Sequence, residues 1–145
     1  MDTLVMFPFH LAFPVTDLAA TEAFYVQGLG CSVGRRSSRW IDFDLFGHQL
    51  SAHLRSTPTA DAAVNAVDGD AVPIPHFGCV LNMDTWRALR ERLDAYGVHF
   101  EIEPRIRFEG KTGEQATLFI RDPSGNALEF KAFIDPTKLF VSQPN

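Results

Sequence analysis

The sequence predicts an α+β domain built from two copies of one module. Its 145 residues, 46% hydrophobic and 21% charged, suit a single globular domain with a buried core. Patterns typical of strands and of helices follow one another in the same order in each half. The landmarks of the first half recur 66 or 67 residues later, in the pairs His10 and His76, Asp17 and Asp84, and Gly30 and Gly97. Such a constant offset indicates an internal duplication.

The first module is expected over residues 4–55. Residues 9–13 predict its first strand. Asp17 precedes an apolar-periodic stretch, and its carboxylate can accept hydrogen bonds from the free amides of a first helical turn, so a helix is expected over 17–27. Residues 41–45 alternate apolar and polar side chains as a strand does, and a turn at 46–48 leads into another strand over 49–54.

The second module is expected over residues 76–134 and repeats this order. Asp84 is the expected cap of a helix over 85–96, in which Leu89 and Leu93 lie at helical spacing and should be buried. Gly97 suits the left-handed position after the helix. Strands follow at 116–120 and 126–133, separated by the turn 122–125. Residues 56–75, rich in Ala, Asp and Pro, are the expected linker, and 135–145 form a C-terminal tail.

Charge and composition exclude several classes of function. Thirteen Lys and Arg against eighteen Asp and Glu give a net charge of −5, and no basic cluster is present. We therefore expect no nucleic-acid and no membrane partner, because binding to phosphates requires concentrated positive charge. No stretch reaches the roughly 18 apolar residues that span a bilayer. With only Cys31 and Cys79, the chain is expected in a reducing, cytoplasmic compartment.

Several motifs, in this order and spacing, resemble the vicinal oxygen chelate superfamily, which includes glyoxalases, bleomycin-resistance proteins and extradiol dioxygenases. They are Phe9-His10-Leu11-Ala12, Phe24-Tyr25 before Leu29-Gly30, His76-Phe77-Gly78, and Asp122-Pro123-Ser124-Gly125-Asn126-Ala127-Leu128-Glu129-Phe130. The resemblance spans residues 7–133. It implies two βαβββ modules that form a cupped mixed β-sheet around a metal site, a small-molecule substrate and a homodimer. Modules could pair within one chain or be exchanged between two.

The same resemblance implies three metal ligands at His10, His76 and Glu129. Each residue alone could be an ordinary strand residue that binds nothing. Strand parity supports the set independently, because each shares a strand face mainly with small residues while bulky apolar side chains take the other face. Two imidazoles and one carboxylate are typical of non-haem Fe(II) oxygenases, so Fe(II) is the expected ion, with Mn, Zn, Ni or Co as alternatives.

The expected site departs from the family at one place. Members often have a fourth ligand, commonly Glu or Gln, on the last strand of the first module, but residues 49–54 contain no carboxylate. Either Ser51 or His53 could occupy that position. His53 is accordingly a ligand, a catalytic acid or base, or a solvated residue at a strand end, and we favour the catalytic role.

The segment 104–115 mixes charged residues with glycines. It is expected either to close over a substrate, with Arg107 or Lys111 meeting an anionic group, or to be a solvated hairpin loop.

These residues favour a ring-cleaving extradiol dioxygenase-like enzyme acting on a small aromatic vicinal diol. A metal with three protein ligands has open positions for both diol oxygens and for O₂. The first alternative is a glyoxalase-type lyase or isomerase, which needs a base to remove a carbon-bound proton. The second is a non-catalytic resistance protein that binds a small molecule. That alternative does not require the three metal-ligating residues.

Overall fold

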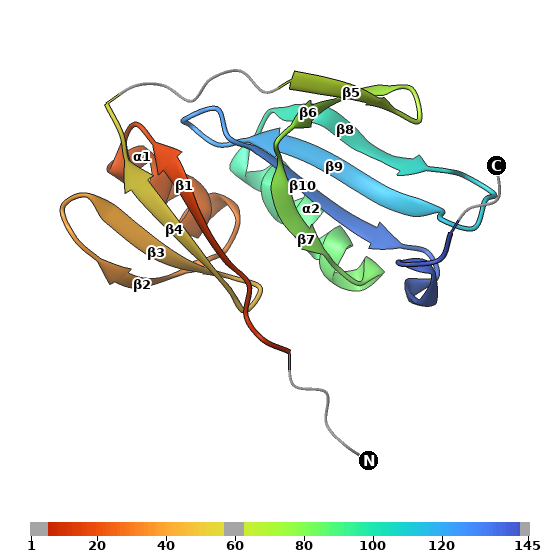
Figure 1. The fold of residues 1–145 in the computed structure, drawn as a ribbon, viewed down its shortest axis with the longest axis horizontal. Helices are drawn as coiled ribbons and strands as arrows, with labels where there is room; N and C mark the ends of the chain where they lie inside the picture. Colours follow the sequence, from red (N-terminus) through yellow and green to blue (C-terminus); the bar gives the residue numbers. More distant parts are fainter. Residues whose placement is uncertain (1–5, 57–62, 143–145) are drawn as a thin grey trace, which may run out of the picture.

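The structure is a computed structural model that describes residues 6–56 and 63–142. Two β-rich modules follow each other, each with one main helical segment, and a hairpin lies between them in sequence (Figure 1). In chain order the elements are β1 (His10–Val15), α1 (Leu18–Glu22), the π-helical turn η1 (Ala23–Gly28), β2 (Ser32–Arg36), β3 (Trp40–Leu45), β4 (His48–Leu54), β5 (Ala63–Val67), β6 (Asp70–Ile74), β7 (Phe77–Val80), α2 (Met83–Tyr96), β8 (Phe100–Arg107), β9 (Gln115–Arg121), β10 (Ala127–Phe133) and the 3₁₀ turn η2 (Pro136–Lys138).

Both modules have the βαβββ topology. Module one forms a four-stranded sheet in the order β1-β4-β3-β2, and module two forms one in the equivalent order β7-β10-β9-β8. In each sheet the first strand runs parallel to the last, and the remaining pairs are antiparallel. The matching order confirms the predicted fold class and places β1 and β7 at sheet edges.

Alternation along the strands separates a core face from a polar face. On β1, Phe13 and Val15 are buried, whereas His10, Ala12 and Pro14 are exposed. The core-facing residues of both sheets join one hydrophobic cluster, which includes Leu89 and Leu93 of α2 as expected. The predicted ligands therefore lie on sheet faces that are turned away from this core.

The helix ends mostly follow the predicted caps. Asp17 Oδ1 accepts a hydrogen bond from the Ala20 amide at 2.9 Å, and Gly97 has a φ of +85° after α2. The expected cap Asp84 is wrong. Helix α2 begins two residues earlier than predicted, and the Asn82 side chain accepts from the Thr85 amide at 2.8 Å. Asp84 instead lies in the first turn, where its charge suits the helix dipole.

Contacts between the modules fix them together. The Phe13 and Phe77 rings have centroids 5.1 Å apart, and the buried Tyr25 hydroxyl donates to Asp122 Oδ2 at 3.0 Å. Arg92 of α2 donates to three main-chain carbonyls near the end of η1, at 3.1–3.2 Å. Positive charge at the end of a helical segment is favourable, so this contact joins the two helical layers.

The segment 56–75 is more than a linker. It contains the hairpin β5–β6, whose strands pair antiparallel across Asp68 and Gly69. These two turn residues have φ values of +45° and +85°, as a type I′ turn requires. In the part of the chain that the structure describes, no helix is long and apolar enough to cross a membrane.

Candidate metal centre

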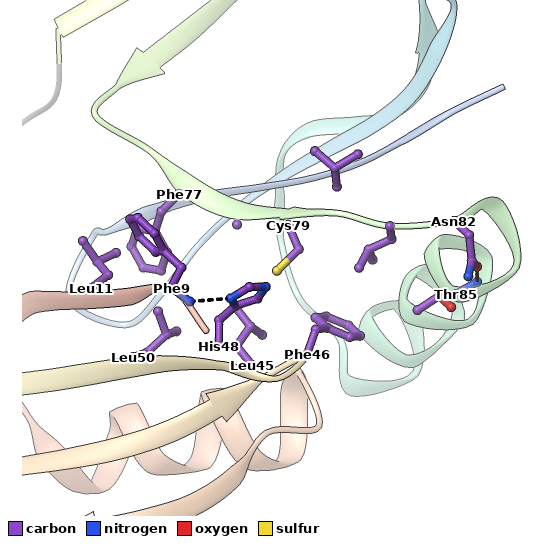
Figure 2. Close-up of a pocket in the computed structure, with 13 residues that line it drawn as sticks. Phe9, Leu11, Leu45, Phe46, His48, Leu50, Phe77, Cys79, Asn82 and Thr85 are labelled. Carbon is purple, nitrogen blue, oxygen red and sulfur yellow. Dashed lines mark hydrogen bonds between the residues drawn. The ribbon is translucent and has the colours of Figure 1, made fainter. Parts of the chain in front are cut away.

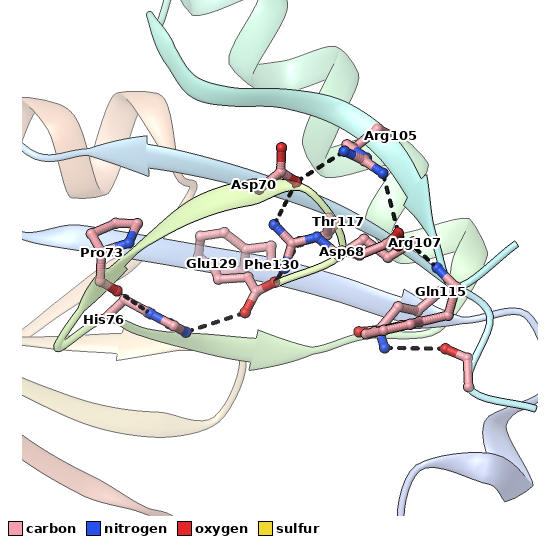
Figure 3. Close-up of polar contacts among 12 residues, drawn as sticks. Asp68, Asp70, Pro73, His76, Arg105, Arg107, Gln115, Thr117, Glu129 and Phe130 are labelled. Atoms are coloured by element: carbon pink, nitrogen blue, oxygen red, sulfur yellow. Dashed lines mark hydrogen bonds and ion pairs between the residues drawn. The ribbon is translucent and has the colours of Figure 1, made fainter. Parts of the chain in front are cut away.

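Two of the predicted ligands meet on the polar face of module two. His76 directly precedes β7, Glu129 lies on the adjacent β10, and His76 Nε2 is 3.2 Å from Glu129 Oε1 (Figure 3). Both side chains are largely buried, with exposed fractions of 23% and 9%. Together with Lys131, they line a small hollow of about 210 Å³.

Gly78 allows β10 to approach β7 closely at this point. It lies directly opposite Glu129, and a Cβ built on it would overlap the Glu129 carbonyl oxygen and carbon. The His76-Phe77-Gly78 motif therefore needs glycine at its third position, because a larger residue would collide with the main chain of β10 at Glu129.

Hydrogen bonds prepare His76 and Glu129 as electron-pair donors. His76 Nδ1 is 2.6 Å from the carbonyl oxygen of Pro73, which can only accept, so Nδ1 carries a hydrogen and Nε2 is the ring atom that faces Glu129. The Thr117 hydroxyl donates to Glu129 Oε2 at 2.5 Å. A histidine with Nδ1 bonded in this way is the usual form of a metal ligand.

The two groups also shift each other's pKa. The hydrogen bond to Glu129 raises the pKa of His76 above its ordinary value, against the opposing effect of burial. Burial alone would raise the pKa of Glu129, but hydrogen bonds from His76 and Thr117 and the charge of Lys131 together lower it. Without metal, the pair is therefore stabilised as imidazolium and carboxylate, and a cation would replace the shared proton.

His10 lies in a separate hollow on module one. It is exposed at the edge strand β1, and its Nδ1 is 2.8 Å from Gln49 Oε1, while Gln49 Nε2 points to Asp42 Oδ2 at 3.5 Å. With Gln49 Oε1 as the acceptor, Nδ1 of His10 carries a ring hydrogen, as Nδ1 of His76 does. His10, Asp42 and Gln49 line a hollow of about 490 Å³ that includes neither His76 nor Glu129. Within residues 6–56 and 63–142, no three His, Cys, Asp or Glu side chains of one chain are placed to hold a metal ion.

The strand register assigns the fourth-ligand position to Ser51. In module two, the residue opposite Glu129 is Gly78, which follows His76 by two positions. In module one, the residue that follows His10 by two positions is Ala12, and it lies opposite Ser51. Ser51 is thus the counterpart of Glu129.

His53 lies two residues further along β4 than Ser51, on the same face, where it is exposed. Its side chain therefore points to the side of the sheet that carries His10, as a catalytic acid or base would require.

A carboxylate that the sequence analysis missed lies beside Ser51. Asp42 on β3 is directly opposite Ser51, is only 4% exposed, and accepts the Ser51 hydroxyl hydrogen at 2.6 Å. Arg35 Nε also contacts it at 3.2 Å. The strict alternation of residues 41–45 placed Asp42 on the polar face, but only the pairing of β3 with β4 shows that it faces Ser51.

The two cations singled out in the charged segment 104–115 lie in different environments. Arg107, at the end of β8, is buried at 3% exposure and lies 2.9 Å from Asp70 and 3.7 Å from Glu129. Lys111 is exposed in the following loop. Arg107 is thus engaged by protein carboxylates.

A cleft of about 450 Å³ with a mixed polar and apolar lining lies between the modules (Figure 2). Leu11, Leu45 and Leu50 line it from module one, and Phe77 and Cys79 line it from module two. His76 and Glu129 are not among its lining residues, and strand parity turns Phe77 and Cys79 to the opposite face of β7. Burial raises the pKa of Cys79 to about 11 and, as the largest cause, that of Cys31 to about 12, so both thiols are protonated near neutral pH.

The donors of the polar faces fit a divalent ion. His10 and His76 each present Nε2 with Nδ1 already bonded, and Glu129 presents an ionised carboxylate. Nitrogen and oxygen donors without thiolate suit Fe(II), Mn(II) and Zn(II). These three residues would hold the ion, although one chain alone brings only two of them together.

A duplicated βαβββ fold with imidazole and carboxylate donors on its polar faces defines a recognisable class of protein. The chain belongs to the Glyoxalase/Bleomycin resistance protein/Dioxygenase superfamily, whose family model matches residues 8–130. No curated protein matches the sequence.

Solved structures agree with this assignment. A glyoxalase/bleomycin resistance protein/dioxygenase from Alicyclobacillus acidocaldarius is 34% identical, with a TM-score of 0.79 over 92% of this chain and 96% of that one. The fosfomycin resistance protein FosX from Listeria monocytogenes is 18% identical, with a TM-score of 0.68 over 94% and 100% of the two chains. Lactoylglutathione lyase from Agrobacterium tumefaciens is 20% identical, with a TM-score of 0.61 over 92% and 96%. The last two similarities show the shared fold alone.

Proposed function

We propose that the protein is a metal-dependent enzyme in which His10, His76 and Glu129 bind one divalent ion and a small oxygenated molecule is the substrate. The observation that carries this proposal is the His76–Glu129 pair, in which Nε2 and a carboxylate oxygen lie 3.2 Å apart on a polar sheet face. Fe(II) is the expected ion, with Mn, Zn, Ni or Co as alternatives. When bound, such an ion polarises the oxygen atoms of a substrate.

A second copy of the chain is proposed to supply His10. The hollow at His76 and Glu129 measures about 210 Å³, below the roughly 300 Å³ at which small-molecule sites begin, and the hollow at His10 is separate from it. Two such half-sites combine when the polar face of module one meets that of module two from a partner. The open edges of β1 and β7 also favour a homodimer.

Complementation between two inactive variants tests this arrangement. His10→Ala and Glu129→Ala are coexpressed with different tags, and the mixed dimer is isolated. If His10 acts across the dimer, the mixed dimer has one complete site and binds metal at one site per dimer. Ligands from a single chain would leave no complete site, and the mixed dimer would then bind no more metal than either variant.

The reaction that we favour is ring cleavage of a small aromatic vicinal diol by O₂. Since Ser51 replaces a fourth carboxylate, three protein ligands leave coordination positions for two diol oxygens and O₂. His53, exposed on the same face as His10, is the proposed acid or base that exchanges a proton with the diol.

A lyase or isomerase of the glyoxalase type is the second candidate, and Asp42 is the observation that favours it. Such an enzyme needs a base for a carbon-bound proton, and Asp42 with Ser51 places a buried carboxylate and a hydroxyl where β4 has no acidic residue. The third candidate, a binding protein without chemistry, predicts ligand binding with no turnover.

Oxygen uptake separates these functions. Fe(II)-loaded protein is tested with a set of catechols in an oxygen electrode, while ring opening is followed by absorbance. Stoichiometric O₂ consumption that is lost in Glu129→Ala supports the dioxygenase. Proton exchange of an α-hydroxycarbonyl substrate into D₂O without O₂, lost in Asp42→Asn, would support the lyase or isomerase instead.

A further inference from the structure

The hairpin β5–β6 is joined to module two through charged contacts rather than through the sheets. It forms its own two-stranded sheet and lies over β8 (Figures 1 and 3). At its turn, Asp68 Oδ2 accepts from the Phe108 amide at 3.0 Å and from Arg105 at 3.2 Å. Asp70 Oδ2 accepts from Arg105 at 3.2 Å and from Arg107 at 2.9 Å.

Arg107 extends this contact to Glu129. Its guanidinium is buried, lies 5.6 Å from the centroid of the Phe119 ring, and reaches Asp70 on one side and Glu129 on the other. The 3.7 Å distance between Arg107 Nη1 and Glu129 Oε2 is an ion-pair distance that is too long for a hydrogen bond. Arg107 therefore attracts the Oε2 side of the carboxylate, while Oε1 faces His76 Nε2.

Asp70 prevents a closer pairing that would block the carboxylate. Arg107 Nε is buried and has no hydrogen-bond partner among the described residues, so the guanidinium has an unused donor. A buried unsatisfied donor is unfavourable, and without Asp70 the guanidinium would turn toward the remaining carboxylate. Glu129 would then be held by Arg107 in place of a metal ion.

The hairpin also orients the second donor. The carbonyl oxygen of Pro73 on β6 accepts from His76 Nδ1 at 2.6 Å and so directs Nε2 toward Glu129. One hairpin thus contacts both members of the donor pair, one directly and one through Arg107 (Figure 3). We propose that β5–β6 is a positioning element for the metal-binding pair, with Asp70 and Arg107 as the positioning residues for Glu129. This inference rests on the metal site of the proposed function.

Cobalt binding to the full-length protein tests the proposal. Co(II) affinity is measured by calorimetry, and the visible absorption of bound Co(II) reports its coordination geometry. Asp70→Asn, which keeps the size of the side chain, should weaken Co(II) binding about 10- to 100-fold and alter the spectrum, as loss of contacts that orient metal ligands typically does. Asp68→Asn is the matched control, since Asp68 does not contact Arg107 and an asparagine oxygen can still accept from the Phe108 amide and hold the hairpin, so it should change the affinity less than about 3-fold.

Arg107→Gln distinguishes positioning from simple charge. If Arg107 only repels a cation, its removal strengthens Co(II) binding. A positioning role predicts weaker binding and a changed spectrum, with partial recovery in Arg107→Lys. Binding by Arg107→Gln that equals or exceeds wild type overturns the proposal, and so does an Asp68→Asn loss as large as that of Asp70→Asn.

The wild-type protein and Glu129→Ala separate this test from the proposed function. If wild-type protein binds Co(II) through Glu129 while Asp70→Asn and Arg107→Gln match it, only the positioning role fails. If wild type and Glu129→Ala bind Co(II) equally, the metal site itself fails and the positioning role fails with it.

Discussion

Replacement of Gly78 by alanine tests the close approach of β7 and β10 at the donor pair. The added Cβ would overlap the Glu129 carbonyl oxygen and carbon, which belong to the main chain and cannot rotate away. Relief of the overlap has to move β7 and β10 apart, at a cost of about 1–3 kcal/mol for overpacking and about 1 kcal/mol for a weakened ladder hydrogen bond. We therefore expect Gly78→Ala to lower the free energy of unfolding by about 2–4 kcal/mol. Metal affinity should fall as well, because the separation of the two strands moves His76 away from Glu129.

Gly34→Ala is the matched control for this measurement. Gly34 is also a strand glycine, on β2, but the nearest atoms to its added Cβ belong to Asp42 at 3.5 and 3.6 Å, which are ordinary contacts. Its unfolding free energy should stay within about 1 kcal/mol of wild type. Urea unfolding followed by circular dichroism gives both values, with an unchanged m-value as the check that the two-state comparison holds. Equal losses of unfolding free energy in Gly78→Ala and Gly34→Ala would contradict a close approach of β7 and β10 at Gly78.

Three further outcomes follow from single side chains. Leu93 lies on the core face of α2 and is fully buried, so Leu93→Ala should lower the free energy of unfolding by about 2–5 kcal/mol, and a loss below about 1 kcal/mol would place this face of the helix in solvent. In metal-free protein, NMR titration should give His76 a pKa above its ordinary value of about 6.5. The stability that this raised pKa contributes is fully present below the pKa of His76 in the unfolded chain, and it is lost as the pH rises through the pKa of His76 in the folded protein. A measured His76 pKa at or below 6.5 would contradict the pairing with Glu129. His53→Ala should keep its metal and lose turnover about 10²–10⁴-fold if His53 is an acid or base, while a loss of metal affinity would make it a ligand.

The duplicated fold could be predicted because its signals are local. Alternation along β1 already separates Phe13 and Val15 from His10, and the structure buries the first two while exposing the third. The repeated landmarks also gave the order of strands and helices in both modules. When one face of a strand or helix is buried, apolar residues recur along the sequence with the period of that element, so the pattern can be read from the sequence alone.

The parts that could not be predicted depend on pairing between distant segments. Asp42 carried no signal as a site residue until β3 was paired with β4, which places it against Ser51. The separation of His10 from His76 likewise depends on how the two sheets meet. The hairpin β5–β6 is different, since Asp68-Gly69 is a strong type I′ turn signal that the Ala- and Asp-rich composition of the segment obscured.

The metal content of the purified protein shows whether His10, His76 and Glu129 form a metal centre. Purified wild-type protein, reconstituted with Fe(II) without oxygen and freed of excess metal, should contain one ion per chain. Glu129→Ala should retain far less, because it lacks one of the three donors that would hold the ion. Glu101→Ala removes a carboxylate that pairs with Arg121 in the same sheet and should keep the full amount. An unchanged metal content in Glu129→Ala, or a similar loss in both variants, would contradict a metal centre formed by His10, His76 and Glu129.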